Sequence, residues 1–551
     1  MAAPKDYYYY VENGTTTFKT MQAGADFVEL IQSNAEFIIE GEGFKGSNDL
    51  EGGGFVVNET TSINKIVVNL VLETLQGDAT AEQAKALGWE ITTGGTEGEK
   101  VVELTPEDYT STTTTDTATG EEKTIYTPSE TFVEKNPKYA FTFSLNDTDK
   151  TATITGSVGK PTELDIPSKI IVNGQDYITT SIGDDAFYGC YGLTSITIPD
   201  RVTSIGSNAF EECSGLKSVT IGSGVTSIGI RAFYNCRGLT SVTIGNSVTS
   251  IGESAFSVCK GLTSITIPSS VKSIGYGAFQ NCSGLTSVTI GSGVTSIGES
   301  IFFCCSGLTS INVDSKNPKY HSAGNCLIET KSSTLIAGCK NSEIPTDGSV
   351  TSIGRKAFAG CSGLTSITIP NSVTSIDTQA FWLCSGLTTI TIPDSVTSIQ
   401  SSVFSGCSGL TSINVDSKNP KYHSAGNCLI ETERKTLIAG CKNSEIPTDG
   451  SVTSIRESAF FDCSGLTSIT IPNSVTYIAY GAFYGCSSLT SVTIDSATIA
   501  GLGSSDSNLL DNATTVYMKS DITTVGTYIT NSFTKAEASD KVGYDMYTKK
   551  A

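Results

Sequence analysis

The chain has 551 residues, of which 38% are hydrophobic and only 17% are charged, and its formal net charge is −21. This length exceeds what one ordinary compact core covers, so we expect two or more folding units or an elongated array. Because Lys and Arg are outnumbered and are not clustered, the composition argues against binding to nucleic acid and against attachment to an anionic membrane surface.

Residues 1–137 differ chemically from the rest, since they carry 24 acidic and 8 basic side chains, a net charge of −16. Apolar runs at 27–31, 36–40 and 65–75 are of strand or helix type, a capped helix is expected at 80–88, and strands are expected at 89–92 and 100–104. The Thr-rich segment 109–131 is interpreted as a loop or linker. We therefore expect a small acidic α+β domain that serves for attachment.

The N-terminus allows two interpretations and shows no targeting signal. The tyrosine run at 7–10 fits either an edge strand or a docking tail that anchors the protein in a larger assembly. No hydrophobic run of signal-peptide type is present, and the longest apolar stretch, at 63–72, is about half of the ~20 residues that a transmembrane helix needs. The sequence thus predicts a cytosolic chain, a chain from which a signal was removed, or export by another route such as host-cell lysis.

A 23-residue repeat occupies residues 181–495, following an expected lead-in at 138–180. Eleven copies read C-S-G-L-T-S-I-T-I-P-x-S-V-T-S-I-G-x-x-A-F-x-x, with a Cys three residues after each Phe. The repeated aromatic residues are Phe187, Phe210, Phe233, Phe256, Phe279, Phe302, Phe358, Phe381, Phe404, Phe460 and Phe483. A fixed period in the twenties indicates a solenoid.

Each repeat predicts one turn of this solenoid. Ile alternates with Thr in GLTSITIP, which predicts a strand with one buried face, and VTSI predicts a second short strand. The A-F-x-x-C stretch predicts a short helical or irregular segment on the other side. One turn cannot bury its apolar face alone, so stability has to come from stacked turns that share parallel-strand hydrogen bonds. One Cys per turn fits a buried ladder of small apolar side chains.

The pattern L-x-x-I-x-I-P-x-x-V-x-x-I-G-x-x-A-F-x-x-C resembles the BspA-like leucine-rich repeats of the Treponema pallidum class over residues 180–495. Residues 138–180 resemble the N-terminal cap of that family and 496–551 its C-terminal cap. The resemblance implies a leucine-rich repeat solenoid with hairpin insertions. It also implies a surface protein, because members are mostly surface proteins of bacteria and some protists, and several are adhesins.

Two insertions, near 314–346 and 416–448, lengthen the spacing of the repeat to 56 residues. The two copies agree over about fifty residues except at 331–333 and 433–435, which predicts a hairpin tip at these positions. The copies lie 102 residues apart, so a block of three repeats was duplicated.

Both His residues of the chain, His321 and His423, lie in these copies. A Cys–His catalytic pair would need a third orienting group, and a metal site built from His321, Cys326 and Cys339 lacks a known zinc spacing. We therefore expect a structural hairpin with a solvated His, and no catalytic residue, cofactor or metal.

The hairpins also predict cross-strand disulfides. If the first turn centres on 331–334, Cys326 lies opposite Cys339, and the copy places Cys428 opposite Cys441. Cross-strand neighbours lie within disulfide range, so two bridges are expected in a protein located outside the cell.

The outward positions of the longer strand form two predicted rows of hydroxyls, about 4.8 Å apart between turns. Three interpretations compete: solvated strand residues without a ligand, a recognition surface for protein or glycan, and an ice-like lattice. Anchor candidates are scattered: Tyr188, Tyr191, Arg231, Tyr234, Arg237 and Trp382. The candidate surface comprises Ser195, Thr197, Ser218, Thr220, Ser241, Thr243, Ser264, Thr266, Ser287, Thr289, Ser366, Thr368, Thr391, Ser468 and Thr470.

Together these features predict a non-enzymatic, surface-displayed repeat protein for adhesion to, or recognition of, protein or glycan on a host or neighbouring cell. One alternative is a structural or receptor-binding component of a phage particle, anchored through residues 1–137 by an assembly partner. Another is an enzyme, disfavoured because the only two histidines lie in a duplicated loop. The expected location is extracellular, on a bacterial cell or a virion.

Overall fold

The computed structural model describes residues 36–40, 65–69, 100–115, 122–501 and 508–550. The chain divides into two compact units, Met1–Lys100 and Val101–Ala551. In the first unit, β1 (Glu36–Glu40) pairs antiparallel with β2 (Lys65–Asn69), so two of the apolar runs are strands. The helix expected at 80–88, the strand expected at 89–92 and the tyrosine run at 7–10 lie outside the described residues.

The second unit begins with a cap that precedes the repeats. Its elements are β3 (Val101–Leu104), β4 (Tyr109–Thr115), β5 (Glu122–Pro128), α3 (Glu130–Lys135), the 3-10 helix η2 (Pro137–Tyr139), β6 (Phe141–Asn146), β7 (Thr151–Ser157), β8 (Lys169–Val172) and β9 (Gln175–Ile182). β4 to β7 form an antiparallel meander, β7 pairs parallel with β9, and β9 pairs parallel with the first short repeat strand. The cap therefore supplies the first template for the parallel ladder.

Two expectations about this region are wrong. The segment 109–131 is not a linker, because β4 and β5 form a hairpin there and α3 follows. The boundary also lies N-terminal to 137, since β3 pairs parallel with β8 inside the cap. The reason is non-local: the Tyr126 ring stacks on Phe143 at 5.2 Å between centroids and meets Tyr109 edge-on at 5.3 Å. These contacts anchor the Thr-rich segment to the cap although its local composition favours a loop, while the side chains of 110–114 stay exposed.

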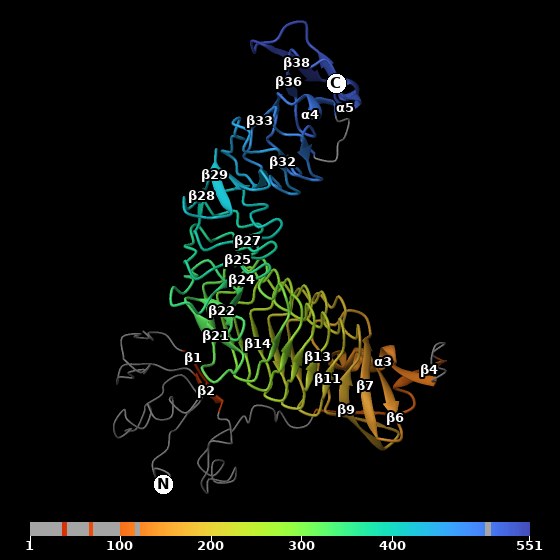
Figure 1. Cartoon of the computed structure of the whole chain (residues 1–551). Coiled ribbons are helices and arrows are strands. Elements are labelled where there is room, and N and C mark those ends of the chain that lie inside the picture. The colour runs from red at the N-terminus through yellow and green to blue at the C-terminus, as the bar shows by residue number, and fades with distance from the viewer. Residues whose placement is uncertain (1–35, 41–64, 70–99, 116–121, 502–507, 551) are drawn as a thin grey trace. The chain divides into compact units, whose positions relative to one another are not determined.

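The repeats form two parallel ladders, one of longer and one of shorter strands (Figure 1). The longer strands are β10 (Ser195–Ile198), β12 (Ser218–Ile221), β14 (Ser241–Thr243), β16 (Ser264–Ile267), β18 (Ser287–Ile290), β20 (Ser310–Val313), β26 (Thr389–Ile392), β28 (Ser412–Val415), β33 (Ser468–Ile471) and β35 (Ser491–Ile494). The shorter strands are β11 (Ser204–Ile205), β13 (Ser227–Ile228), β15 (Ser250–Ile251), β17 (Ser273–Ile274), β19 (Ser296–Ile297), β24 (Ser352–Ile353), β25 (Ser375–Ile376), β27 (Ser398–Ile399), β32 (Ser454–Ile455) and β34 (Tyr477–Ile478). Both predicted strands of the repeat are thus confirmed, with registers that advance by 23 residues.

The core is a set of ladders in which equivalent side chains stack from turn to turn. The rings of Phe210, Phe233 and Phe256 are parallel, with 5.2 Å between successive centroids. All three are fully buried, as are the Ala and Cys of the same repeats. Because every turn buries its side chains against its two neighbours, the stability of the stack is collective.

The A-F-x-x-C segments are irregular turns rather than helices. Each contains two residues in the left-handed region, one before the Ala and one before the Cys, such as Arg231 at φ 53° and Asn235 at φ 61°. The β-branched Val258 occupies the second of these positions at φ 64°. For an L-residue with a branched Cβ this conformation is strained.

Each insertion contains the predicted hairpin together with a further strand that precedes it, and it divides the core. The strands are β21 (Tyr320–Ala323), β22 (Cys326–Glu329) and β23 (Thr334–Ala337), and in the second copy β29 (Tyr422–Ala425), β30 (Cys428–Glu431) and β31 (Thr436–Ala439). β21–β22 and β22–β23 are antiparallel, and β23 then pairs parallel with β24, so the short-strand ladder restarts from the hairpin. Leu327 packs in the upstream core, whereas Ile328 and Leu335 pack in the downstream core. The hairpin is therefore a partition whose two faces belong to different cores.

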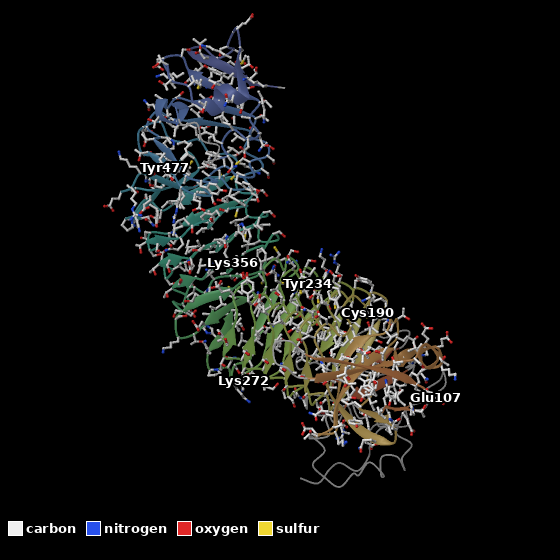
Figure 2. All side chains as sticks on the ribbon, turned by 90° about the vertical axis from the view of Figure 1, so that its right-hand side faces the viewer. Glu107, Cys190, Tyr234, Lys272, Lys356 and Tyr477 are labelled. Carbon is white, nitrogen blue, oxygen red and sulfur yellow. The ribbon has the colours of Figure 1, made fainter. Side chains whose placement is uncertain are left out.

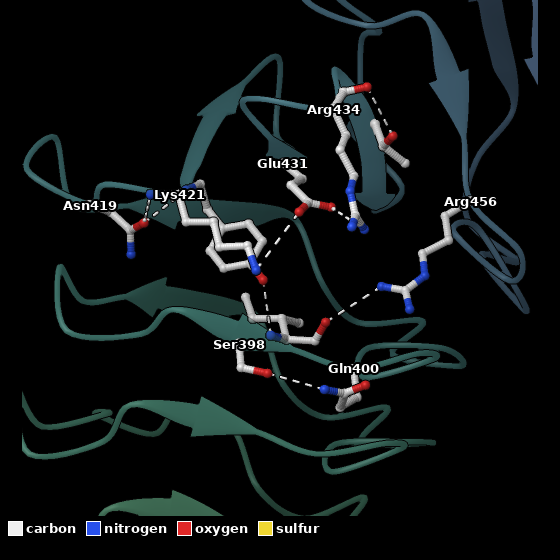
Figure 3. Close-up of polar contacts among 10 residues, drawn as sticks. Ser398, Gln400, Asn419, Lys421, Glu431, Arg434 and Arg456 are labelled. Carbon is white, nitrogen blue, oxygen red and sulfur yellow. Dashed lines mark hydrogen bonds and ion pairs between the residues drawn. The ribbon is translucent and has the colours of Figure 1, made fainter.

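Close approach and polar contacts fix the hairpins in place. A Cβ on Gly338 would lie 2.0 Å from a ring carbon of Phe358, so only Gly fits where the chain re-enters the stack. At the second hairpin the Tyr422 hydroxyl accepts a hydrogen bond of 3.0 Å from the Ile399 backbone N–H, and Arg456 donates to the Ile399 carbonyl at 3.5 Å (Figure 3). These bonds satisfy backbone groups at the end of the upstream ladder.

The C-terminal cap continues the longer-strand ladder. Its elements are α4 (Ala497–Gly501), β36 (Thr515–Lys519), α5 (Thr527–Ser532), β37 (Phe533–Lys535) and β38 (Tyr544–Lys549). β36 pairs parallel with β35 and antiparallel with β38, which reverses the direction and ends the parallel stack. Among the described residues, no helix has the length and apolar character required to cross a membrane.

Candidate recognition surface

The outward face of the longer strands, here called the hydroxyl face, carries the two predicted rows. Each strand buries its Ile or Val and turns Ser and Thr outward, and the register aligns Ser195 with Ser218 and Thr197 with Thr220. Of the fifteen predicted residues, Ser287 and Thr470 are half-buried and the others are exposed. The predicted geometry of the rows is therefore present.

The rows are interrupted at three places, between β14 and β16, between β20 and β26, and between β28 and β33. The longer strands group into separate sheets, because β14 does not pair with β16, and residues 366–369 form no strand. An ice-like lattice requires continuous, regular spacing, so the interruptions argue against that interpretation. The face is instead a series of short polar platforms of two or three turns each.

Hydroxyl groups on the repeats divide into two structural classes. Thr226 and Thr249, which precede the short strands, each donate to the Thr carbonyl one turn earlier at 3.0 Å, so these hydroxyls tie turns together. The hydroxyls of Ser218 and Thr220 on the hydroxyl face have no hydrogen-bond partner within the described part of the chain. Hydroxyls of the second class are free to donate to and accept from a ligand.

Toward the C-terminus, hydroxyls of the hydroxyl face have hydrogen-bond partners within the protein. The Asn312 amide donates to the Ser310 hydroxyl at 3.1 Å, and Thr493 is buried and accepts from the Lys541 ammonium at 2.9 Å. The free rows are thus best developed on β10 to β18, before the first hairpin.

A second surface, the AFxxC edge, consists of the A-F-x-x-C turns at 183–191, 206–214, 229–237 and their equivalents in later repeats. The structure brings several scattered anchor candidates together here. Arg231 pairs with Glu211 at 3.0 Å, and its guanidinium carbon lies 4.2 Å from the centroid of the Tyr234 ring. Burial raises the pKa of the Glu211 carboxyl, and the Arg231 charge opposes that shift. Figure 2 shows Tyr234 and Lys356 along the same margin of the ribbon, across from Lys272.

Sequence reasoning did not identify all members of this edge. Tyr191 donates to Glu212 at 3.3 Å, and Arg237 donates to Asn235 at 2.8 Å. Trp382 stacks on Phe303, which was not among the candidates. The sequence could have revealed them, because Glu211, Phe303 and Trp382 occupy the same position of the repeat, directly after the repeated Phe.

Ten of the eleven repeat cysteines donate their thiol to a backbone carbonyl of the preceding turn, whereas Cys190 donates to the Ser157 hydroxyl at 3.7 Å. The Cys236 thiol donates to the Phe210 carbonyl at 3.2 Å, and the Cys259 thiol donates to the Phe233 carbonyl at the same distance. Burial raises the pKa of both thiols. A thiol held protonated in an apolar ladder is a poor nucleophile.

The hairpins do not assemble the catalytic or metal site that was weighed. His321 Nδ1 lies 2.8 Å from the Thr330 hydroxyl, whereas the Cys326 thiol is buried and faces the Gly324 carbonyl at 3.5 Å. Burial raises the pKa of the Cys326 thiol to about 12. Within the described ranges, no group of three His, Cys, Asp or Glu side chains is placed to hold a metal ion.

The register expected for the disulfides is wrong. A β-bulge between Leu327 and Ile328 shifts the pairing, so that Leu327 lies opposite Ala337 and Cys326 does not face Cys339 directly. All four hairpin thiols, Cys326, Cys339, Cys428 and Cys441, are buried and free in this structure. Their pairing stays a prediction.

The family profile described as "BspA type Leucine rich repeat region (6 copies)" matches residues 180–309, 330–432 and 434–538. The chain belongs to this BspA-type leucine-rich repeat family. The matched residues cover most of the stacked turns and nearly all of the second insertion, which confirms the resemblance and the fold class derived from the repeat.

Solved leucine-rich repeat structures show similarity to the chain. A leucine rich cell surface protein from Faecalibacterium prausnitzii A2-165 is 31% identical, with 64% of this chain and 93% of that one covered and a TM-score of 0.45. A leucine-rich repeat protein from Eubacterium ventriosum is 23% identical, with 74% and 98% covered and a TM-score of 0.45. One from Bacteroides ovatus is 25% identical, with 69% and 98% covered and a TM-score of 0.42. No curated protein matches the chain.

Proposed function

We propose that this BspA-type repeat protein is a non-enzymatic recognition protein that acts outside the cell, by binding protein or glycan on a host or neighbouring cell. The observation that carries the proposal is the pair of rows of hydroxyls on β10 to β18, which are exposed except for the half-buried Ser287 and have no hydrogen-bond partner among the described residues. Such rows offer donors and acceptors at regular spacing to a ligand with many polar groups. Ladder thiols whose pKa is raised by burial, such as those of Cys236 and Cys259, are poor nucleophiles.

The test is binding of the full chain to arrays of glycans and extracellular matrix proteins, followed by variants of the hydroxyl face. Thr220→Lys and Thr243→Lys place bulky charges on exposed row positions without touching the core. We expect both to weaken binding at least about tenfold, since each blocks several contacts around it. Ser247→Lys is the matched control, because Ser247 is exposed but lies off the strand. Equal binding by all variants would remove the hydroxyl face as the ligand site.

The setting of the protein is a separate question, which labelling of the source material answers. Antibody against residues 138–551 that labels the bacterial envelope supports an adhesin. Antibody that labels phage particles supports the alternative, in which the chain is attached to an assembly partner through the part of 1–137 that precedes the cap, residues 1–100. The negative charge of residues 1–100, with 16 acidic and 6 basic side chains, is the feature that favours a dedicated attachment role. Labelling confined to the cytoplasm contradicts both versions.

A further inference from the structure

On the AFxxC edge the side chains at equivalent positions differ from repeat to repeat, whereas on the hydroxyl face they are alike. At the two row positions the eleven repeats hold only Ser, Thr or Asn, so successive turns look alike. A ligand on such a face can shift by whole turns and meet the same groups again. The position after the repeated Phe holds Tyr, Glu, Tyr, Ser, Gln, Phe, Ala, Trp, Ser, Phe and Tyr in chain order. Discrimination of a single partner requires features that occur once, and the edge supplies them.

One cluster on this edge, here called the junction cluster, consists of Tyr276, Phe303, Lys356 and Trp382. The rings of Phe303 and Trp382 stack at 5.2 Å between centroids with an interplanar angle of 7°. The Lys356 ammonium lies 6.0 Å from the Tyr276 centroid and 5.9 Å from the Trp382 centroid. Tyr276 is 42% exposed and the other three are half-buried, so the cluster reaches solvent.

The turns do not require these aromatic residues. Ser257 and Gln280 occupy the phase of Phe303 and Trp382 in other repeats, and those turns have the same backbone pattern. The second hairpin junction repeats the surroundings but not the cluster: Ser458 stands at the phase of Lys356, while Phe461 and Tyr484 stack at 5.4 Å. The chain thus contains its own control, an aromatic pair without the cation.

The cation of the junction cluster lacks an anionic partner. In the described part of the chain no ion pair involves Lys356, and the neighbouring Arg355 is already paired with Glu299 at 3.5 Å. The ammonium lies 6.0 Å from the Tyr276 centroid and 5.9 Å from the Trp382 centroid, so a carboxylate brought to it from outside would form a charge-assisted hydrogen bond in partly apolar surroundings. Exposed Tyr and Trp are also the side chains that concentrate binding energy at protein interfaces.

We propose that the junction cluster is the docking site for a protein partner that inserts an Asp or Glu carboxylate between apolar side chains. The carboxylate pairs with Lys356, and the flanking apolar side chains cover the rings of Tyr276 and Trp382. The site lies on the AFxxC edge and not on the hydroxyl face. It is therefore tested separately from the function proposed above.

The test selects cyclic peptides from a naive phage-displayed library on the full chain, without bias toward any surface. We expect the dominant peptides to share an Asp or Glu next to an apolar residue. For the synthesised peptides, Kd should rise about 30-fold for Trp382→Ala and at least about tenfold for Lys356→Gln. The control Tyr484→Ala should change Kd less than about twofold, because the second junction lacks the cation.

Folding and alternative ligands are controlled separately. Trp382→Phe keeps an aromatic ring against Phe303, so restored binding in this variant shows that Trp382→Ala lost a contact and not the fold. Selected peptides without a carboxylate, or with affinities unchanged in both Lys356→Gln and Trp382→Ala, would overturn the proposal. If peptide binding is lost in Thr220→Lys and kept in the other variants, the site lies on the hydroxyl face. A polyuronate oligosaccharide that binds through Lys356 when no peptide does would replace the protein partner by an acidic glycan.

Discussion

Because the hairpin separates two cores, we expect truncations of two neighbouring residues to destabilise opposite sides of it. Leu327 and Ile328 are both fully buried, yet Leu327 belongs to the upstream core and Ile328 to the downstream core. Truncating a fully buried Leu or Ile to Ala costs about 2–5 kcal/mol, from lost transfer energy and the cavity left behind. Leu327→Ala should therefore destabilise the turns before the hairpin, and Ile328→Ala the turns after it.

Hydrogen exchange measured peptide by peptide resolves the two sides. A loss of 2–5 kcal/mol in one core corresponds to an increase of roughly 30-fold to several thousandfold in the exchange of amides that open with it. For Leu327→Ala we expect this increase in β16 to β20, with β24 to β27 little changed, and for Ile328→Ala the reverse. The equivalent pair Leu429 and Ile430 in the second hairpin is the matched control. If both variants accelerate exchange equally on both sides, the cores are one cooperative unit and the partition is refuted.

Four further predictions follow from local geometry. Val258→Asn should stabilise the fold by about 1 kcal/mol in chemical denaturation, because it relieves a β-branched residue at φ 64° and restores the Asn found at this phase in both neighbouring turns. Gly338→Ala should cost about 1–3 kcal/mol, since its Cβ would meet the Phe358 ring at 2.0 Å. The 2.5 Å hydrogen bond to Asp147 raises the pKa of the Tyr177 hydroxyl to about 12. Stability from that bond is complete below pH ~10, is lost between pH ~10 and 12, and is absent in Tyr177→Phe. Thiol counting on protein isolated without reductant should give twelve of the sixteen thiols if both predicted hairpin disulfides form, and sixteen if neither does.

Each of these has a result that contradicts it. A lower unfolding midpoint for Val258→Asn would mean that packing of the half-buried Val outweighs the backbone strain. An unchanged midpoint for Gly338→Ala would show that the Phe358 ring moves aside freely. If the stability of Tyr177→Phe falls between pH 10 and 12 as steeply as that of the unchanged protein, another group carries that pH dependence.

The repeating part of this protein follows from the amino-acid pattern alone. A 23-residue period with alternating Ile and Thr leaves one solution, a stack of parallel turns, because a single turn cannot bury its own apolar face. The same reasoning placed the hydroxyl rows and the hairpins, since both depend on local alternation and on the comparison of one repeat with the next. The equal spacing of the Cys residues likewise predicted a buried ladder.

Features that depend on contacts between distant segments do not follow from the sequence and are seen in the folded chain. The Thr-rich segment at 109–131 reads locally as a linker, but pairing of β5 with β6 and stacking of Tyr126 on Phe143 make it part of the cap. The β-bulge in β22 moved the hairpin register away from the position that loop length alone predicts. The junction cluster brings Tyr276 to Trp382 through Lys356 across an inserted hairpin, and no spacing rule reports such a meeting. The repeat fixes what every turn shares, whereas packing decides where the exceptional residues meet.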